Sequence, residues 1–186
     1  MALFWSSTNQ MRDRWVNLMY ILCGGTKDIH RRNFDLLCKH PRVLSVFVSD
    51  EDRISVDSRP VYWRHPGTFL PYYLGRYRII LAPRELLFLT KEADVGQINN
   101  CFKVVCTESG RYDGVKGHVH SYENFFGEFC FGDRNEYLAQ LLEQREYPTA
   151  IYLALDSLWN VGHGCYGFVE EKFKKPPLTV KQGDAT

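Results

Sequence analysis

The spacing of apolar residues changes at Pro41, from helical before it to strand-like after it. Before Pro41, apolar residues recur at helical intervals over residues 15–22 and again over residues 34–38, and a pair of glycines separates the two runs. A chain that starts in this way must place two short helices back to back, each with one apolar face to bury. The sequence therefore predicts an N-terminal helical pair.

Both predicted helices have recognisable start signals. Ser7 followed by Gln10 has the spacing of a capping box, in which side chains satisfy free backbone N–H groups of the first turn. Thr26 or Asp28 can cap the second helix, which Pro41 ends. The first helix is therefore expected to start near Ser7 and the second near Thr26.

After the second helix, the chain becomes rich in strand-forming segments. Residues 43–48 and 54–56 flank a polar turn and predict a β-hairpin. A helical pair before a hairpin also occurs in winged-helix domains, but three consecutive acidic residues at 50–52 would repel phosphate, so a helical pair packed on a sheet is preferred. Further strands are predicted at residues 77–81, 86–90, 101–107, 118–122, 125–131, 150–155 and 166–173.

One long amphipathic helix is predicted at residues 133–146. The uninterrupted apolar run at residues 150–155 is typical of a central strand that is buried on both faces. Together these patterns predict the α+β class, with an N-terminal helical pair and a β-hairpin, followed by a mainly antiparallel sheet with one packed amphipathic helix.

The composition limits the class of protein. Apolar residues make up 45% of the chain and aromatic residues 15%, which excludes an intrinsically disordered protein. The 6 cysteines are too sparse for a disulfide scaffold of 186 residues, so reduced thiols and an intracellular location, cytoplasmic or nuclear, are expected. No segment is apolar over the length that spans a bilayer, which predicts a protein without a membrane partner. We expect one compact domain over residues 1–177 and a flexible tail at 178–186.

The net charge of +1 conceals an asymmetry along the chain. Residues 1–84 carry 13 basic and 7 acidic side chains, a net charge of +6, whereas residues 85–186 carry 10 basic and 15 acidic side chains, a net charge of −5. This division predicts either a dipolar surface with one face suited to an anionic partner, or a basic lobe at 1–84 and an acidic lobe at 85–177 that attract each other.

The most distinctive segment is residues 58–84, which contain five arginines, one histidine, six aromatic residues and no Asp or Glu. Prolines and glycines interrupt this segment, which predicts a loop or a series of turns. Arginines neutralise phosphates and exposed rings stack on unpaired bases, so the composition is typical of a groove for single-stranded nucleic acid. The predicted contacts, which include two arginines of the second helix, are Arg31, Arg32, Arg59, Tyr62, Trp63, Arg64, Tyr72, Tyr73, Arg76 and Arg78.

The preferred functional prediction is therefore a non-enzymatic binding module that engages nucleic acid, and RNA in particular. Tyr, Trp and Arg are also the residues enriched at protein interfaces, so the alternative is an adaptor or accessory protein that binds another protein through the same surface. Proline and tyrosine also build packed surface loops in which arginines stack on rings for structural reasons alone. The sequence predicts no particular oligomeric state.

A third prediction is a metal-dependent nuclease. Asp156 ends the predicted strand at 150–155, and Glu170 and Lys172 lie on the next predicted strand, which is similar to the site of nucleases with the restriction-endonuclease-like fold. In such a site two carboxylates hold Mg²⁺, which activates a water molecule, and the lysine stabilises the developing charge. The motif is short and two prolines follow it at 176–177, so the three residues are candidates without a firm catalytic assignment.

A zinc site is a further candidate. His118 and His120 are two residues apart on a predicted strand, so both imidazoles would point to one face. Cys101 and Cys106 could complete a ligand set, although no Cys-x2-Cys knuckle is present. Zn²⁺ here and Mg²⁺ at the nuclease candidate are the cofactors that the sequence suggests, and neither is assigned firmly.

Overall fold

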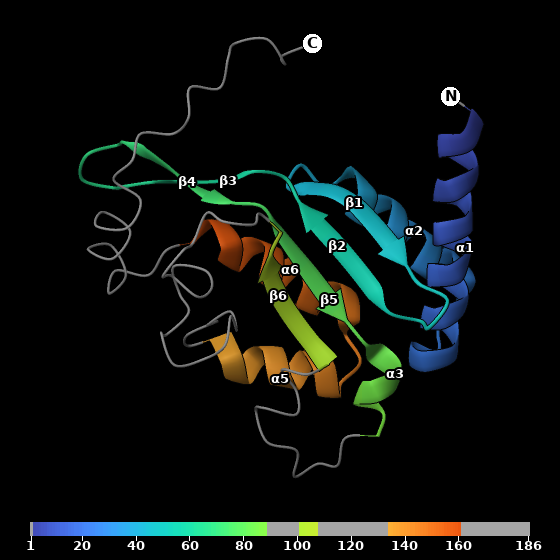
Figure 1. Ribbon diagram of the computed structural model, residues 1–186. Helices are drawn as coiled ribbons and strands as arrows, with labels where there is room; N and C mark the ends of the chain where they lie inside the picture. The colour runs from blue at the N-terminus through green and yellow to red at the C-terminus, as the bar shows by residue number, and fades with distance from the viewer. Residues whose placement is uncertain (1, 89–100, 108–133, 161–186) are drawn as a thin grey trace.

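A computed structural model describes residues 2–88, 101–107 and 134–160 (Figure 1). In chain order the elements are α1 (Ala2–Cys23), α2 (Lys27–Lys39), β1 (Val43–Val48), β2 (Ile54–Ser58), β3 (Val61–Arg64), β4 (Pro71–Gly75), β5 (Tyr77–Leu81), α3 (Pro83–Leu86), β6 (Phe102–Cys106), α5 (Asn135–Glu143) and α6 (Tyr147–Trp159). The predicted α+β class is confirmed, as are the N-terminal helical pair and the first hairpin.

The helices α1 and α2 form a pair that packs through aromatic rings. Trp15 of α1 and Phe34 of α2 are both buried, with ring centroids 5.9 Å apart. The hydroxyl of Thr26 accepts a hydrogen bond from the backbone N–H of Ile29, as predicted for the start of α2. The predicted start of the first helix was wrong, because α1 begins at Ala2 and Ser7 lies inside it.

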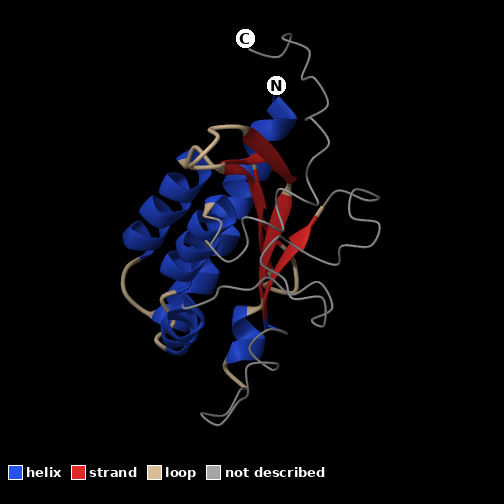
Figure 2. Ribbon diagram, turned by 90° about the vertical axis from the view of Figure 1, so that its left-hand side faces the viewer, coloured by secondary structure: helices blue, strands red, loops and turns tan. Residues whose placement is uncertain are grey.

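The main sheet has four antiparallel strands in the order β1-β2-β5-β6. Val56, Ile79 and Val104 are cross-strand partners, and all three are buried. The long helices lie on one side of the sheet (Figure 2), so alternate residues of each strand face this helical layer and the residues between them face away. A helical pair packed on a sheet is therefore what the chain forms.

The segment at 150–155 is helical, so its prediction as a buried strand was wrong. A short apolar run does not distinguish a buried strand from a buried helix. In α6 the fully buried residues include Ala150, Ile151, Ala154, Leu155 and Leu158, which follow helical spacing. Proline is tolerated in the first turn of a helix, where its missing N–H costs nothing, and so Pro148 starts this helix instead of preventing it.

Two other predicted elements differ from the structure. The predicted strand at 86–90 is wrong at its start, because Leu86 ends the short helix α3. The helix predicted at 133–146 is confirmed but shorter, over Asn135–Glu143. The strand predicted at 101–107 is confirmed as β6, whereas those at 118–122, 125–131 and 166–173 lie outside the described residues.

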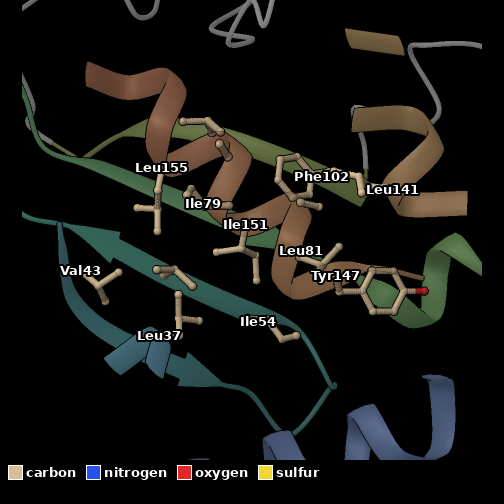
Figure 3. Packing of buried hydrophobic residues seen from close by; sticks show 14 of the residues in the cluster. Leu37, Val43, Ile54, Ile79, Leu81, Phe102, Leu141, Tyr147, Ile151 and Leu155 are labelled. Carbon is tan, nitrogen blue, oxygen red and sulfur yellow. The ribbon is translucent and has the colours of Figure 1, made fainter. Parts of the chain in front are cut away.

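The core lies between the helices and the sheet. Figure 3 shows Ile151 and Leu155 of α6 against Ile79 and Leu81 of β5, and all four side chains are buried. Residues of α1, α2 and α5 belong to the same cluster. None of the helices in the described ranges is both long enough and apolar enough to cross a membrane.

Candidate binding surface on the β3–β4 hairpin

The segment predicted as a loop or a series of turns contains a second β-hairpin, β3–β4. Tyr62 pairs with Tyr73 and Trp63 pairs with Tyr72, so large side chains occupy both faces of the ribbon. The hairpin lies in the connection between β2 and β5, which are neighbours in the main sheet. It extends away from that sheet to one end of the molecule (Figure 1). The prediction missed it because proline and glycine breakers obscure two short strands of four and five residues.

The inner face of the hairpin belongs to the core. The side chain of Trp63 is only 6% exposed and its ring contacts those of Tyr72 and His65, at centroid distances of 5.7 and 5.4 Å. A ring in this position cannot stack on a base unless the hairpin moves. The prediction of Trp63 as a nucleic-acid contact is therefore at odds with its place in the fold.

The outer face carries an exposed aromatic pair and a cation. The rings of Tyr62 and Tyr73 lie 5.0 Å apart between centroids, and Tyr62 is 40% exposed. Arg64 follows Tyr62 by two residues on β3, so its side chain emerges on the same face. Arg64 is exposed and has no ion pair or side-chain hydrogen bond with another residue of the described part.

The tip of the hairpin is apolar, and the sequence did not single out its residues as a site. Phe69 is 71% exposed and Leu70 is 56% exposed. Residues of this size and polarity are commonly buried, so two adjacent ones at a projecting turn are an unusual exposed patch. The signal in the sequence is the placement of an apolar pair between Gly67 and Pro71, where a turn would ordinarily carry polar residues.

Three of the six arginines among the predicted contacts, Arg31, Arg59 and Arg78, form side-chain contacts within the described part of the chain. Arg78 donates two hydrogen bonds to Asp57, at 2.6 and 3.0 Å, on the sheet face away from the helices. Arg59 donates from Nε to the backbone oxygen of Val43 at 3.2 Å. Arg76 is exposed at the junction between β4 and β5.

Arg31 and Arg32 lie on α2, which packs beside the edge strand β1 and does not belong to the hairpin (Figure 1). Arg31 forms an ion pair with Asp28, one turn earlier in the same helix, at 2.6 Å. The ten predicted contacts are therefore not assembled on one continuous surface. The structure brings together Tyr62, Arg64 and Tyr73 on the outer face of the hairpin and separates them from the helical arginines.

The nuclease candidate Asp156 lies on α6 and not at the end of a strand, so this part of the prediction was wrong. Its carboxylate accepts hydrogen bonds from Arg42, Arg134 and Asn160, at 3.1, 2.9 and 3.0 Å. Two guanidinium groups already neutralise this carboxylate, which leaves it poorly suited to bind a cation. Glu170 and Lys172 lie outside the described residues.

The zinc candidate also meets a geometric obstacle. Cys101 directly precedes β6 and Cys106 is its last residue, and an extended strand advances by roughly 3.3 Å per residue, so the strand separates the two backbone positions by more than the span of one zinc site. His118 and His120 lie outside the described residues. Within the described ranges, no three His, Cys, Asp or Glu side chains form a group that could hold a metal ion.

The ion pairs of Asp57 and Asp156 set the ionisation of both carboxyl groups. Partial burial acts to raise the pKa of Asp156, but the hydrogen bonds from Arg134 and Arg42 outweigh it, and the pKa lies below its ordinary value. In the same way, the hydrogen bonds from Arg78 and Ser45 outweigh burial and lower the pKa of Asp57. Both groups therefore stay ionised in the folded protein to a lower pH than in the unfolded chain.

We expect the Asp156→Asn variant to be less stable than the wild type at neutral pH by roughly 0.2–1 kcal/mol, because the pairs are half-exposed. A carboxyl group with a lowered folded-state pKa stabilises the fold above its unfolded pKa and loses this effect as the pH falls through the folded value. The difference should therefore vanish in acid. Urea unfolding from neutral pH to below about pH 3 tests this. Glu143→Gln, at an exposed position on α5, is the control, and a difference for Asp156→Asn that persists in acid would contradict the prediction.

Comparison with known proteins reveals no relative: no family model matches the chain, and no curated protein or solved structure shows significant similarity to it. Functional inference for this chain therefore rests on the geometry of the hairpin and of its surroundings.

Proposed function

We propose that the protein is a non-enzymatic binding module that engages another protein through the β3–β4 hairpin. The observation that carries this proposal is the contrast between the aromatic and the basic residues of this segment. Tyr62, Phe69 and Leu70 are exposed, whereas Arg78 and Arg59 are held in contacts within the chain. Exposed aromatic and apolar side chains beside an arginine are typical of the centre of a protein interface.

The position of the hairpin supports the same proposal. A ribbon that projects from the sheet can reach a partner without moving the core. The inner-face residue Trp63 and Leu74 on the neighbouring strand are buried and attach the hairpin to the core. Rigid support of this kind lowers the entropy that is lost when a partner binds.

Single-stranded nucleic acid, with RNA favoured, is the second candidate. It is supported by Tyr62 and Tyr73, whose paired rings offer a stacking platform, and by Arg64 beside them. The absence of acidic residues from 58–84 leaves the sequence of the hairpin free of groups that would repel phosphate. Arg64 and Arg76, which are both exposed, would then supply the phosphate contacts.

The first experiment is a titration of labelled single-stranded RNA and DNA at two salt concentrations, with Mg²⁺ and then with EDTA, followed by a gel of the products. Phosphate contacts predict an affinity that falls steeply with salt. Under the preferred proposal we expect no salt-sensitive binding of either strand. Salt-sensitive binding of an intact strand would replace the preferred proposal with the second candidate, and Mg²⁺-dependent fragments would replace both with a nuclease.

The direct test of protein binding is a selection of peptides from a displayed random library on the wild-type protein. The selected peptides should bind Tyr62→Ala at least about tenfold more weakly than the wild type, because truncation of an interface aromatic commonly has this effect. Tyr137→Ala is the matched control, since Tyr137 is a similarly exposed tyrosine on α5. Peptides that bind all three proteins equally would contradict a role for the hairpin.

A further inference from the structure

Phe69 adopts a backbone conformation that a phenylalanine disfavours. Its φ angle is 58°, in the left-handed region, where the Cβ atom crowds the backbone carbonyl oxygen. Phe69 is 71% exposed, so burial of its side chain contributes little free energy that could offset the backbone strain. A glycine or an asparagine would occupy this turn at a lower cost in stability. The described part of the chain offers nothing that offsets the cost of a phenylalanine here.

Two other non-glycine residues of the described part have positive φ angles. The side chain of each forms a polar contact within the chain. Asp52 is a short polar residue of the kind that tolerates this conformation, and its carboxylate pairs with Arg84. Arg145 donates a hydrogen bond to the backbone oxygen of Leu22 at 2.8 Å. Phe69 is therefore the exception, and a strained residue without an internal role suggests a functional one.

The tip is held in one conformation by His65. The imidazole Nδ1 accepts hydrogen bonds from the backbone N–H groups of Gly67 and Thr68, at 3.0 and 3.1 Å. The N–H of Phe69 donates to the backbone oxygen of His65 at 2.8 Å, and the N–H of His65 donates to that of Leu70 at 3.1 Å. The exposed ring is thus presented by a turn that is already ordered before any partner arrives.

We propose that Phe69, which the turn holds exposed before a partner binds, is an anchor residue that inserts together with Leu70 into an apolar segment of a partner protein. Acidic residues of the same partner segment lie beside Arg64. This inference rests on the proposed protein-binding function and specifies the chemistry of the partner. Leu70 is aliphatic and has no ring to stack on a base, so the tip favours a protein partner over a nucleic acid.

Charge complementarity indicates which charged residues the partner segment should carry. Residues 58–84 contain no acidic side chain, and Arg64 is the exposed cation on the outer face of the hairpin. An acidic residue beside the apolar contact would pair with Arg64, whereas a basic residue would be repelled. The partner segment is therefore expected to combine Leu, Ile or Phe with Asp or Glu.

The test uses three forms of the full-length protein: wild type, Phe69→Gly and Phe88→Gly. Phe88 is 85% exposed, and its φ is not positive, so the same substitution there is a matched control. Random peptides from a displayed library are selected on the wild type and sequenced, and their affinities for all three forms are measured. Urea unfolding of each form is measured in parallel.

Under this proposal, the wild type enriches peptides that combine apolar and acidic residues. Their affinity falls at least about tenfold for Phe69→Gly and is unchanged for Phe88→Gly. The urea midpoint of Phe69→Gly is unchanged or higher than that of the wild type, because glycine relieves the backbone strain. A lower midpoint for Phe69→Gly than for Phe88→Gly would overturn the proposal, because it would show that Phe69 packs internally.

The remaining outcomes separate this inference from the proposed function. Peptides that depend on Tyr62 but not on Phe69 would overturn the anchor and leave the protein-binding function in place. Peptides that depend on neither residue would overturn both. Self-association that Phe69→Gly abolishes, measured by sedimentation, would replace the acidic partner with a second copy of the chain. Nucleic-acid binding that Phe69→Gly abolishes would replace it with a nucleic acid.

Discussion

Replacement of Trp15 by alanine is expected to lower the free energy of unfolding by about 3–5 kcal/mol, the largest effect of any single change considered. Trp15 is fully buried and packs against Phe34 where α1 meets α2. Truncation leaves a cavity in the only contact between large rings of the helical pair within the described residues. Typical domains are stable by about 5–15 kcal/mol, so this loss is a large part of the total.

Urea unfolding of Trp15→Ala and Trp15→Phe provides the test. The indole Nε1 of Trp15 is buried and has no hydrogen-bond partner in the described part of the structure. Trp15→Phe therefore removes a polar group that gains nothing from burial and keeps most of the ring, so it should cost far less than the alanine variant. Equal losses in the two variants would contradict this prediction, because they would show that the cost does not follow the volume that is removed.

The second large effect is expected at Ile151, which lies on α6 against β5 (Figure 3). Ile151→Ala should lower the free energy of unfolding by about 2–5 kcal/mol, because the neighbouring side chains cannot fill the space that is left. Ile21→Ala on α1 is the matched control, because Ile21 is 64% exposed on a helix and its truncation opens no cavity. We expect the control to stay within about 0.5 kcal/mol of the wild type.

These two variants also test the arrangement of the helical layer. If α6 did not cover the sheet, Ile151 would be accessible to solvent and its truncation would resemble that of Ile21. A small effect at Ile151 would therefore contradict the packing of α6 on β5 as well as the predicted magnitude.

Local patterns in the sequence were sufficient to predict the elements that carry their own start and stop signals. The cap at Thr26 fixes the beginning of α2, and the polar turn between β1 and β2 fixes the first hairpin. The run at 150–155 was ambiguous, because a proline such as Pro148 can either start or end a helix and continuous apolarity fits both a buried strand and a buried helix. Only the packing of α6 against the sheet decides between the two.

The candidate site was predictable in its location but not in its chemistry. The composition of 58–84 pointed to the segment that forms the projecting hairpin. Whether an arginine is available to bind a ligand depends on its cross-strand partners. Arg78 and Asp57 are 21 residues apart in the sequence, and they meet only because β5 pairs with β2. The strain at Phe69 lies in a backbone angle, which no residue pattern reveals.

The pairing of Arg78 with Asp57 and of Arg84 with Asp52 affects how fast a partner can arrive. Each pair presents a dipole to solvent in place of a separate charge, and salt at physiological strength screens fields beyond about 8 Å. Long-range attraction should therefore contribute little to the encounter, and association is expected at roughly 10⁵–10⁶ M⁻¹s⁻¹, as for uncharged surfaces. Selectivity would then act after contact, so that correct partners differ from incorrect ones in how long they stay bound.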